Sequence, residues 1–553
     1  MLGRMMDFPL TLTHLFERAE RLFPGRPIVS RKADRSLARA TVKDFGVRTR
    51  RLMSALEGLG VQPGTRVATL AWNHAQHLEV YFAVPLMGAI VHTLNLRLHP
   101  NEIAYIADHA EDSVVVVDAS LVPLLEKFID KVPWIRHVVV IADGTTEVKG
   151  GYLDYEKLLE GAEPRAELPQ LDERAAAMLC YTSGTTGNPK GVLYTHRSTC
   201  LHAMAVCLRD SLGLASMDTA MPVVPMFHAA AWGIPYAAIA TGAKLVFPGP
   251  HLDPASIVEL MEGEEVTLAA GVPTIWLGIL DLLDRDRKAE KAHDLSRVRT
   301  MVIGGAAAPP AMIDGFKTRH GLEVTHAWGM TEMNPLGTVA RLKPDMVGQA
   351  WDTELPVRAT QGFPVMFVEH RLMDESGKAL PWDGKTMGEL EVRGPWVASS
   401  YFADEGKDRF TETGWFKTGD VVTIDPEGYV TITDRAKDVV KSGGEWISSV
   451  ALENALMSHP AVLEAAVFAA AHPKWDERPV AAIVQRPGSD VSEEELAGHI
   501  KDQFASYWLP DAYVFMDQIP RTSTGKFLKT RLRELYGDIL LVTSQPPPAV
   551  KAK

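Results

Sequence analysis

The apolar positions at the start of the chain change from helical spacing to short, strand-like runs. Residues 12–23 repeat apolar side chains at intervals of three and four, which predicts a helix that ends before Pro24. Short apolar runs then predict strands at 66–72, 89–94 and 113–117. Amphipathic stretches predict helices after Asn73, a candidate N-cap, and from Pro100 onward. This alternation is typical of a doubly wound α/β fold, in which helices cover both faces of mostly parallel strands.

The same alternation returns later in the chain and changes near residue 434. Further strands are predicted to begin near Met178, Ala220, Lys244, Val266, Thr300 and Val324. A charged segment, 434–438, follows a strand at 429–432; after it we expect a helix at 453–457, strands at 463–468 and 481–485, and a capping box at 492–495. We therefore predict a large N-terminal α/β domain (1–433), a hinge (434–441) and a small, mobile α+β C-terminal domain (442–553) whose end is a mobile tail.

Composition excludes several classes of protein. The 553 residues carry a formal charge of −13 without a dominant Lys/Arg run, which argues against nucleic acid as a partner. Three cysteines without paired metal spacing, and a start without a signal peptide, favour a reducing, cytoplasmic location. Residues 219–243 lack charge and are long enough to span a bilayer, but their three prolines favour a buried strand, a loop and a core helix instead.

Residues 181–192 carry the strongest chemical signal. They read Tyr-Thr-Ser-Gly-Thr-Thr-Gly-Asn-Pro-Lys-Gly-Val, so glycines, hydroxyl groups and one lysine alternate in a segment unsuited to packing. Glycine lets backbone N–H groups approach an anion, and hydroxyl and ammonium groups bind phosphate oxygens. A Walker loop starting at Gly184 would need a second glycine at position 189, where Pro189 stands. The segment therefore predicts a different loop for a triphosphate.

The order of this loop resembles the signature of the adenylate-forming superfamily, which comprises acyl-CoA synthetases, peptide-synthetase adenylation domains and luciferases. The resemblance extends from about residue 12 to residue 536 and comes nearest to bacterial medium- and long-chain fatty acid-CoA ligases. It implies phosphate contacts for the loop residues Thr182, Ser183, Gly184, Thr185, Thr186, Gly187 and Lys190. It also implies an enzyme that uses ATP, Mg²⁺ and coenzyme A.

Two further segments resemble the superfamily's nucleotide and metal motifs. Residues 304–309, Gly-Gly-Ala-Ala-Ala-Pro, form a small-residue turn after a predicted strand, where a flat ring could lie on the backbone. Residues 328–332, Trp-Gly-Met-Thr-Glu, combine an aromatic ring, a hydroxyl and a carboxylate. The resemblance assigns the nucleotide to Gly305, Ala306, Ala307, Trp328, Gly329, Met330 and Thr331, and Mg²⁺ to Thr185 and Glu332. A sparse carboxylate set suits Mg²⁺, which keeps waters and shares phosphate oxygens.

The remaining resemblance lies toward the C-terminal end. Residues 414–420, Gly-Trp-Phe-Lys-Thr-Gly-Asp, resemble the ribose motif, so Asp420 would accept the sugar hydroxyls and Arg435 would hold the same nucleotide. The loop 520–527 presents Lys526, which matches the superfamily's catalytic lysine. The resemblance also implies catalytic roles for Thr185 and Glu332. We expect Lys529 and Arg531, in the helix that follows, to be solvated. The resemblance also assigns the pivot to Lys437 and nucleotide contacts to Lys441 and Trp446.

The acid itself is expected at residues 222–232, Pro-Val-Val-Pro-Met-Phe-His-Ala-Ala-Ala-Trp. They resemble the acyl motif of fatty acyl-CoA ligases, which implies substrate roles for His228, Trp232 and Gly304; a core histidine and a core tryptophan are the alternatives. That branch commonly has Val-Asn where this chain has Ala229 and Ala230, which leaves the preferred acid open.

We expect an ATP-dependent carboxylic acid:CoA ligase for medium- to long-chain fatty acids. The alternatives are a ligase for an aryl, cyclic or short thioether acid, an enzyme that delivers its acyl group elsewhere, and an inactive nucleotide-binding relative. The expected partners are a small carboxylic acid, ATP and CoA, and the resemblance allows a homodimer and transient membrane contact without a transmembrane segment.

Overall fold

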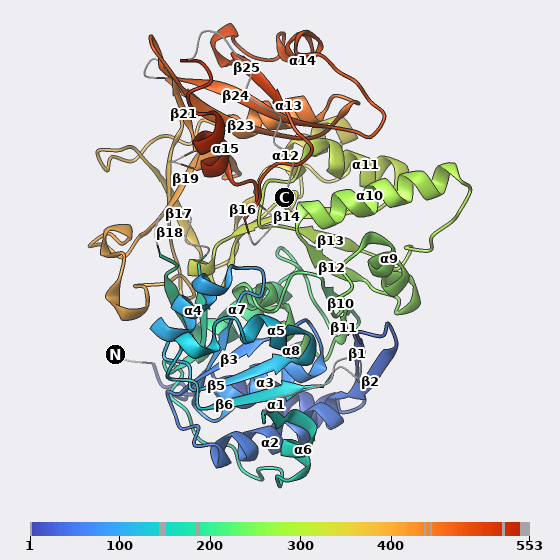
Figure 1. The fold of residues 1–553 in the computed structure, drawn as a ribbon, viewed down its shortest axis with the longest axis vertical. Helices are drawn as coiled ribbons and strands as arrows, with labels where there is room; N and C mark the ends of the chain where they lie inside the picture. Colours follow the sequence, from blue (N-terminus) through green and yellow to red (C-terminus); the bar gives the residue numbers. More distant parts are fainter. Residues whose placement is uncertain are drawn as a thin grey trace.

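The computed structural model describes residues 3–142, 151–182, 188–435, 438–442, 445–522 and 526–541. Figure 1 shows a large body, coloured blue to yellow, with a smaller orange to red body above it. Among the described residues, no helix combines the length and apolarity needed to cross a bilayer. Residues 219–243 form the strand, loop and core helix that the sequence predicted.

A seven-stranded sheet in the order β7-β6-β5-β3-β4-β8-β9 forms one layer of the large body. Its neighbours are parallel except for β8 and β9, so the prediction of mostly parallel strands is confirmed here. The strands are β3 (Arg66–Leu70), β4 (Ile90–Thr93), β5 (Val114–Asp118), β6 (His137–Ile141), β7 (Leu153–Asp154), β8 (Ala176–Tyr181) and β9 (Gly191–Thr195). The helices of this region are α2 (Val42–Gly58), α3 (Ala75–Leu86), α4 (Pro100–His109), α5 (Val122–Leu125) and α6 (Tyr155–Glu160).

A nine-stranded sheet in the order β16-β15-β14-β13-β12-β10-β11-β1-β2 forms a second layer. Its strands are β1 (Pro27–Arg31), β2 (Leu37–Thr41), β10 (Thr219–Pro222), β11 (Lys244–Phe247), β12 (Leu268–Gly271), β13 (Thr300–Ile303), β14 (Val324–Gly329), β15 (Leu336–Val339) and β16 (Phe363–Pro364). Its central strands run parallel, so their carboxyl ends share one edge. The helices are α1 (Leu12–Leu22), α7 (His196–Cys207), α8 (Ile234–Thr241), α9 (Pro254–Gly263), α10 (Pro273–Lys288), α11 (Pro310–His320) and α12 (Trp351–Ala359).

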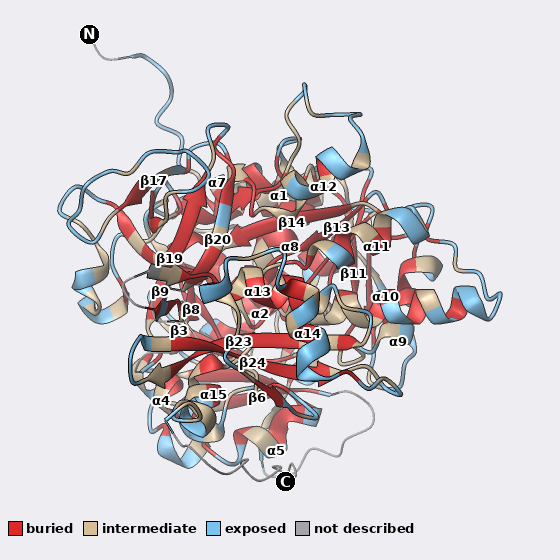
Figure 2. Cartoon of the chain, turned by 90° about the horizontal axis from the view of Figure 1, so that it is seen from above, coloured by how far each residue is buried: buried red, intermediate tan, exposed pale blue. Residues whose placement is uncertain are grey.

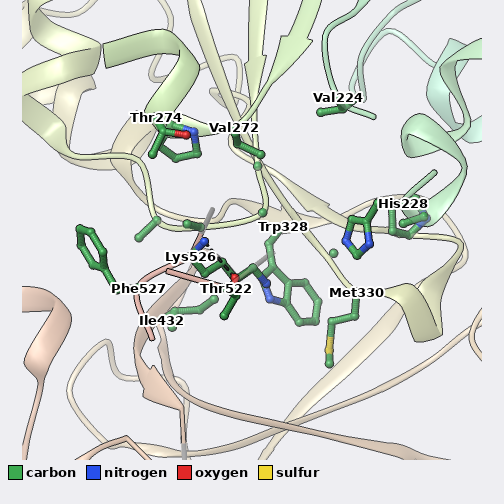
Figure 3. Close-up of a pocket in the computed structure, with 18 of the residues that line it drawn as sticks. Val224, His228, Val272, Thr274, Trp328, Met330, Ile432, Thr522, Lys526 and Phe527 are labelled. Carbon is green, nitrogen blue, oxygen red and sulfur yellow. Dashed lines mark hydrogen bonds between the residues drawn. The ribbon is translucent and has the colours of Figure 1, made fainter. Parts of the chain in front are cut away.

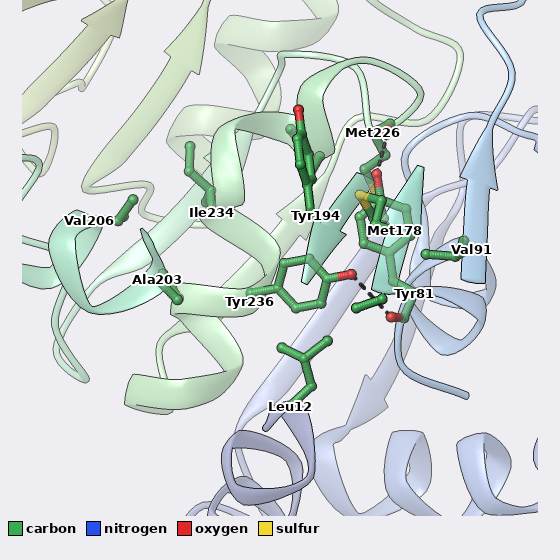
Figure 4. Close-up of a cluster of buried hydrophobic side chains, with 14 of the residues drawn as sticks. Leu12, Tyr81, Val91, Met178, Tyr194, Ala203, Val206, Met226, Ile234 and Tyr236 are labelled. Carbon is green, nitrogen blue, oxygen red and sulfur yellow. Dashed lines mark hydrogen bonds between the residues drawn. The ribbon is translucent and has the colours of Figure 1, made fainter. Parts of the chain in front are cut away.

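The core between these layers is built from large apolar side chains of α1, α3, α7 and α8 (Figure 4). The rings of Tyr81 and Tyr236 lie 5.6 Å apart, centroid to centroid, and both are fully buried. The hydroxyl of Tyr236 donates to the carbonyl of Tyr81 at 3.2 Å, and that of Tyr81 donates to the carbonyl of Met226. The phenol groups thus gain partners while their rings fill the core.

A four-stranded antiparallel sheet, β17-β18-β19-β20, leads to the smaller body. Its strands are β17 (Glu369–Met373), β18 (Gly388–Arg393), β19 (Phe416–Ile424) and β20 (Val430–Arg435). The smaller body holds β21 (Val440–Ser442), β22 (Glu445–Ile447), β23 (Val462–His472), β24 (Asp476–Gln485) and β25 (Ala512–Phe515), with α13 (Ser449–Met457), α14 (Glu493–Ile500) and α15 (Lys529–Tyr536). Its long strands β23 and β24 are largely buried (Figure 2), and the predicted α+β class is confirmed.

Local sequence signals placed several helix starts correctly, and two expectations were wrong. The helix expected at 453–457 begins four residues earlier, at Ser449. The capping box of α14 is present, because Ser492 and Glu495 bond reciprocally to each other's backbone N–H groups. Asn73, however, does not cap α3, whose N-cap is His74. The Asn73 amide instead donates to the carbonyls of Pro222 and Val224 at 2.9 Å and accepts from the Met226 N–H at 2.7 Å. Asn73 therefore shapes the loop after β10 that enters the candidate site.

Candidate active site

A cavity of about 460 Å³ lies between the large and small bodies. Its walls come from the carboxyl ends of β10, β12, β13 and β14 and from residues 521–522 and 526–530 of the small body. The edge at the carboxyl ends of parallel strands is where open α/β sheets bind ligands. Figure 3 shows Lys526 and Thr522 of the small body facing Trp328, Met330 and His228 of the large body.

Two predicted nucleotide residues, Trp328 and Arg435, contact the buried carboxylate of a third, Asp420. The indole Nε1 of Trp328 donates to Oδ2 of Asp420 at 2.9 Å, and Nε of Arg435 lies 2.6 Å from Oδ1. Asp420 and Arg435 are opposite each other in the β19–β20 pairing, which explains how two separate motifs converge. These donors hold a 1% exposed carboxylate in place at the cavity wall, where its remaining lone pairs can accept hydroxyl groups.

The turn after β13 offers backbone rather than side chains to the cavity. A Cβ atom on Gly304 would lie 3.0 Å from the carbonyl oxygen of Ala327 and 3.0 Å from the Trp232 ring, so this position has little room for a side chain. Gly305 has φ of +84°, a left-handed conformation that favours glycine. Ala306 and Ala307 continue this thin wall, which suits a flat ring.

The predicted metal ligand Glu332 is buried and oriented by a residue the sequence did not indicate. The hydroxyl of Tyr401 donates to Oε1 of Glu332 at 2.6 Å. Burial, reinforced by the charge of Glu332, raises the pKa of Tyr401, so the phenol remains a neutral donor. Thr331 lies beside Glu332, and its carbonyl accepts from the Tyr194 hydroxyl at 2.6 Å. The hydroxyl groups of Tyr401 and Tyr194 thus hold the short turn at Thr331 and Glu332 in place.

This donor set fits Mg²⁺. Within the described part of the chain, no group of three or more His, Cys, Asp or Glu side chains could enclose a metal. A single oriented carboxylate beside a phosphate site is how Mg²⁺ is usually held, since it shares its coordination with phosphate oxygens and water. Thr185, the second predicted metal residue, lies outside the described residues.

The two described ends of the predicted triphosphate loop are joined to each other. The N–H of Thr182 donates to the carbonyl of Lys190 at 2.9 Å, and the N–H of Lys190 donates to the Thr182 hydroxyl at 3.2 Å. The ammonium of Lys190 lies 5.5 Å from the centroid of the Tyr401 ring. One tyrosine therefore contacts both the loop lysine and the carboxylate of Glu332, the predicted metal ligand. Ser183, Gly184, Thr185, Thr186 and Gly187 lie outside the described residues.

Lys526 reaches the cavity from a closed loop of the small body. The Thr522 N–H donates to the Lys526 carbonyl at 2.7 Å, and the Lys526 N–H donates back to the Thr522 hydroxyl at 3.1 Å. A further bond joins the Leu528 N–H to the carbonyl of Pro520 at 2.8 Å. The expectation that Lys529 is solvated is wrong, because its side chain is buried against Glu453 at 2.7 Å. Arg531 is exposed, as expected.

A left-handed turn follows His228 and carries Trp232, two of the predicted acyl residues. Ala229, Ala230, Ala231 and Trp232 have φ values of 43°, 53°, 47° and 57°. His228 and Trp232 both line the cavity, and the Trp232 ring packs against Gly304. Burial, together with the positive charges of Lys526 and Arg97, lowers the pKa of His228 to about 4. Six apolar side chains also line the cavity: Val223, Val224, Leu252, Val272, Ile275 and Leu277.

Some predicted residues are not brought into the cavity. The ammonium of Lys441 lies 5.5 Å from the centroid of the Trp446 ring and 3.5 Å from Oε1 of Glu375, and neither Lys441 nor Trp446 lines the cavity. The predicted pivot Lys437 lies outside the described residues. Tyr401 and Glu453 do line the cavity, but they were missed because single residues far from any motif leave no spacing signal.

Comparison with known proteins decides the family. The family model described as AMP-binding enzyme matches residues 16–402, and the model described as AMP-binding enzyme C-terminal domain matches 451–526. The chain belongs to the AMP-binding enzyme family. The adenylate-forming resemblance drawn from the motifs is thereby confirmed.

Similar proteins cover almost the whole chain. A long-chain-fatty-acid–CoA ligase of Thermus thermophilus is 49% identical over 96% of both chains. A medium-chain-fatty-acid–CoA ligase of Ectopseudomonas oleovorans is 45% identical over 98% of this chain and 99% of its own. A 3-methylmercaptopropionyl-CoA ligase of Ruegeria lacuscaerulensis is 44% identical over 98% of this chain and 100% of its own. In structure, the anthranilate CoA ligase AuaEII in complex with anthranoyl-AMP matches with a TM-score of 0.85 at 27% identity, covering 97% of this chain and 99% of its own.

Proposed function

We propose that this AMP-binding enzyme is an ATP-dependent carboxylic acid:CoA ligase that works through an acyl-adenylate. The observation that carries the proposal is the composition of one cavity. Its lining combines Trp328 and Asp420, predicted to hold the nucleotide, with Lys190 and Glu332, predicted to meet phosphate and Mg²⁺, and with several apolar side chains. Lys526 lines the same cavity, and we place it where a carboxylate and an α-phosphate would meet.

In the first step, an oxygen of the substrate carboxylate forms a bond to the α-phosphorus of ATP, and the bond to pyrophosphate breaks. The loop 182–190 would hold the β and γ phosphates through backbone N–H groups, hydroxyls and Lys190. Glu332, oriented by Tyr401, would hold Mg²⁺, which when bound neutralises phosphate charge. Lys526 would stabilise the charge that moves between the two reacting groups.

In the second step, the thiol sulfur of CoA forms a bond to the acyl carbon, the bond from that carbon to the phosphate oxygen breaks, and AMP leaves while the thiol gives up its proton. The neutral imidazole of His228, whose pKa of about 4 keeps it uncharged at neutral pH, would lie beside this carbonyl. Lys526 and the incoming pantetheine need the same approach, so the small body would rotate between the steps. We place the hinge at 434–441 with its pivot at Lys437, and Lys441 and Trp446 in the second orientation.

The acid is proposed to be a medium- to long-chain fatty acid. The apolar part of the cavity and the names of the two most identical relatives described above support it. The relative that bears the name of a short thioether acid supports the main alternative, and Ala229 and Ala230 would leave room for a branched or cyclic acid. An inactive relative is disfavoured, since Glu332 and Lys526 are both present at the cavity.

The test is a CoA-dependent AMP-formation screen across short, medium, long, aromatic and thioether acids. We expect AMP formation to require acid, ATP, Mg²⁺ and CoA together, with pyrophosphate released before CoA is added. Pyrophosphate release without a CoA-dependent thioester would favour an enzyme that delivers its acyl group elsewhere. No reaction with any acid would favour the inactive relative.

We further propose a cytoplasmic enzyme that contacts membranes only transiently, to collect its acid, and that pairs as a homodimer. Sedimentation of the purified protein would check the dimer, and flotation with vesicles would check the membrane contact.

A further inference from the structure

A buried ionic cluster lies beside the cavity, where the two bodies meet. It contains Asp434, Glu453 and Lys529, which are 2%, 7% and 8% exposed, and the fully buried Ser449. The ammonium of Lys529 lies 2.7 Å from Oε1 of Glu453 and 3.9 Å from Oδ1 of Asp434. It also donates to the hydroxyl of Ser449, which in turn donates to Oδ2 of Asp434. Buried charges are costly unless they are paired in this way.

The cluster joins the two bodies across the proposed hinge. Asp434 pairs with Val421 of β19, so it belongs to the sheet that precedes Lys437. Ser449 and Glu453 belong to α13 of the small body, and Lys529 is the first residue of α15. The carboxylate of Asp434 also accepts from the N–H of Ser449 at 3.2 Å, at the positive N-terminus of α13. A neighbouring bond from the Ser448 hydroxyl to the Thr433 carbonyl, at 2.7 Å, crosses the same boundary.

The cluster is also connected directly to the proposed catalytic lysine. Lys529 is three residues after Lys526, and the loop between Pro520 and Leu528 is closed by backbone hydrogen bonds. Glu453 is itself fixed, because its Oε1 accepts from the Val467 N–H of β23 at 2.8 Å. Lys529 thus ties the base of the Lys526 loop to α13 and β23 on one side and to Asp434 of β20 on the other.

We propose that Asp434, through Ser449 and Lys529, is a positioning residue that holds the small body in the orientation in which Lys526 reaches the cavity. The inference rests on the ligase function proposed above. Rotation about Lys437 would leave Asp434 on β20 while Ser449 and Lys529 move away. Each orientation change must then break charge-assisted hydrogen bonds and find new partners for buried charges, which favours the adenylate-forming orientation.

The test substitutes Asp434→Asn in the full-length enzyme, because this change keeps the shape, removes the charge and replaces one acceptor oxygen with an NH2 donor. Adenylation is measured as pyrophosphate release in a single turnover without CoA. Thioester formation is measured separately, from supplied acyl-adenylate and CoA. We expect the adenylation rate to fall roughly tenfold, the scale of one hydrogen bond to a charged group. Thioester formation should stay within about twofold of the wild-type rate or rise, because the second orientation loses nothing.

A matched control is Asp218→Asn. Asp218 is 5% exposed and pairs with Arg299 at 2.8 Å in the large body, away from the small body. It should lower the unfolding midpoint without changing the ratio of the two half-reactions. Lys529→Met should change the ratio of the two half-reactions, and Lys529→Arg, which keeps the positive charge, should leave the ratio closer to that of the wild type. A fluorescence label on each body adds a readout independent of turnover, and Asp434→Asn should shift their distance distribution.

An unchanged ratio of half-reactions in Asp434→Asn, whether both rates fall or neither does, would overturn the inference. An unchanged label distance would overturn it as well. These outcomes differ from failure of the proposed function, in which the wild-type enzyme itself would adenylate no acid.

Discussion

The contact between Tyr401 and Glu332 gives the sharpest prediction for the metal site. Tyr401→Phe removes the hydroxyl that donates to Oε1 at 2.6 Å but keeps the ring that lies 5.5 Å from the Lys190 ammonium. The substitution therefore changes the orientation of one carboxylate while leaving the cation–π contact intact. Both side chains are about 5% exposed, so water cannot easily replace the lost donor.

The magnitude follows from the type of bond. A hydrogen bond to a charged group contributes about 1.5–3 kcal/mol, or roughly 10- to 150-fold in an equilibrium constant. Loss of a group that orients a metal ligand typically lowers metal affinity or activity about 10- to 100-fold. We expect the Mg²⁺ concentration that gives half-maximal adenylation to rise at least about tenfold in Tyr401→Phe. The rate at saturating Mg²⁺ should stay much closer to wild type.

The assay is pyrophosphate release titrated with Mg²⁺ at fixed ATP. Tyr236→Phe is the matched control, since its buried hydroxyl donates to the neutral carbonyl of Tyr81 at 3.2 Å within the core. It should cost about 1 kcal/mol of stability and leave the Mg²⁺ titration unchanged. A Tyr401→Phe enzyme with a wild-type titration, or a control that shifts equally, would refute the assignment of Glu332 to the metal.

Three other predictions address the remaining parts of the site and the core. Lys526→Ala should slow adenylation roughly 10²–10³-fold while supplied acyl-adenylate is still converted to the thioester; equal losses in both half-reactions would make Lys526 structural. Wild-type kcat/KM should rise roughly fourfold per added methylene until the apolar part of the cavity is filled, and Trp232→Ala should favour bulky acids. Competition assays with acids of different length and bulk measure both effects, and a flat profile in both enzymes would contradict them. His202 accepts from the Leu336 N–H at 3.1 Å, and burial lowers its pKa to about 3. The imidazole binds its proton more tightly in the unfolded state, so the stability that neutral His202 contributes is complete above pH 6.5 and is lost as the pH falls toward 3. In His202→Gln the unfolding free energy should therefore decline less steeply between pH 7 and 5, by up to about 1.4 kcal/mol per pH unit. An unchanged slope would contradict this.

Short-range patterns were sufficient to predict much of the fold. The helix at α1 and the capping box of α14 depend on residues within a few positions of each other, and both are present. The alternation of strands and helices likewise predicted parallel sheets, since a parallel pair needs a crossover between its strands. Motif order predicted that the nucleotide residues share a site, and Trp328, Asp420 and Arg435 do meet.

The failures have one physical cause, which is pairing between residues distant in sequence. Asparagine is a common N-cap residue, but the side-chain amide of Asn73 forms hydrogen bonds with three backbone groups about 150 positions away. Lys529 has the helical context of a solvated lysine, but Glu453 and Asp434 lie 76 and 95 positions before it. Spacing within one element carries no information about such partners. Tyr401 was missed for the same reason, because Glu332 lies 69 positions before it.

The turn that carries Trp232, a predicted acyl residue, shows most directly where local conformational preference and the proposed function conflict. A left-handed conformation costs a non-glycine residue roughly 1–2 kcal/mol, and four such residues follow one another from Ala229 to Trp232. Alanine, with the smallest side chain of any chiral residue, limits crowding within that turn, while the turn brings the Trp232 ring against Gly304 at the cavity wall. Gly304 in turn has little room for a side chain, so the ring and the thin backbone wall depend on each other. Asparagine adopts the left-handed conformation more readily than alanine, so we expect the departure from Val-Asn at Ala229 and Ala230 to affect this turn through backbone conformation as well as through side-chain volume. A preference for particular acids should follow from how firmly this turn holds Trp232.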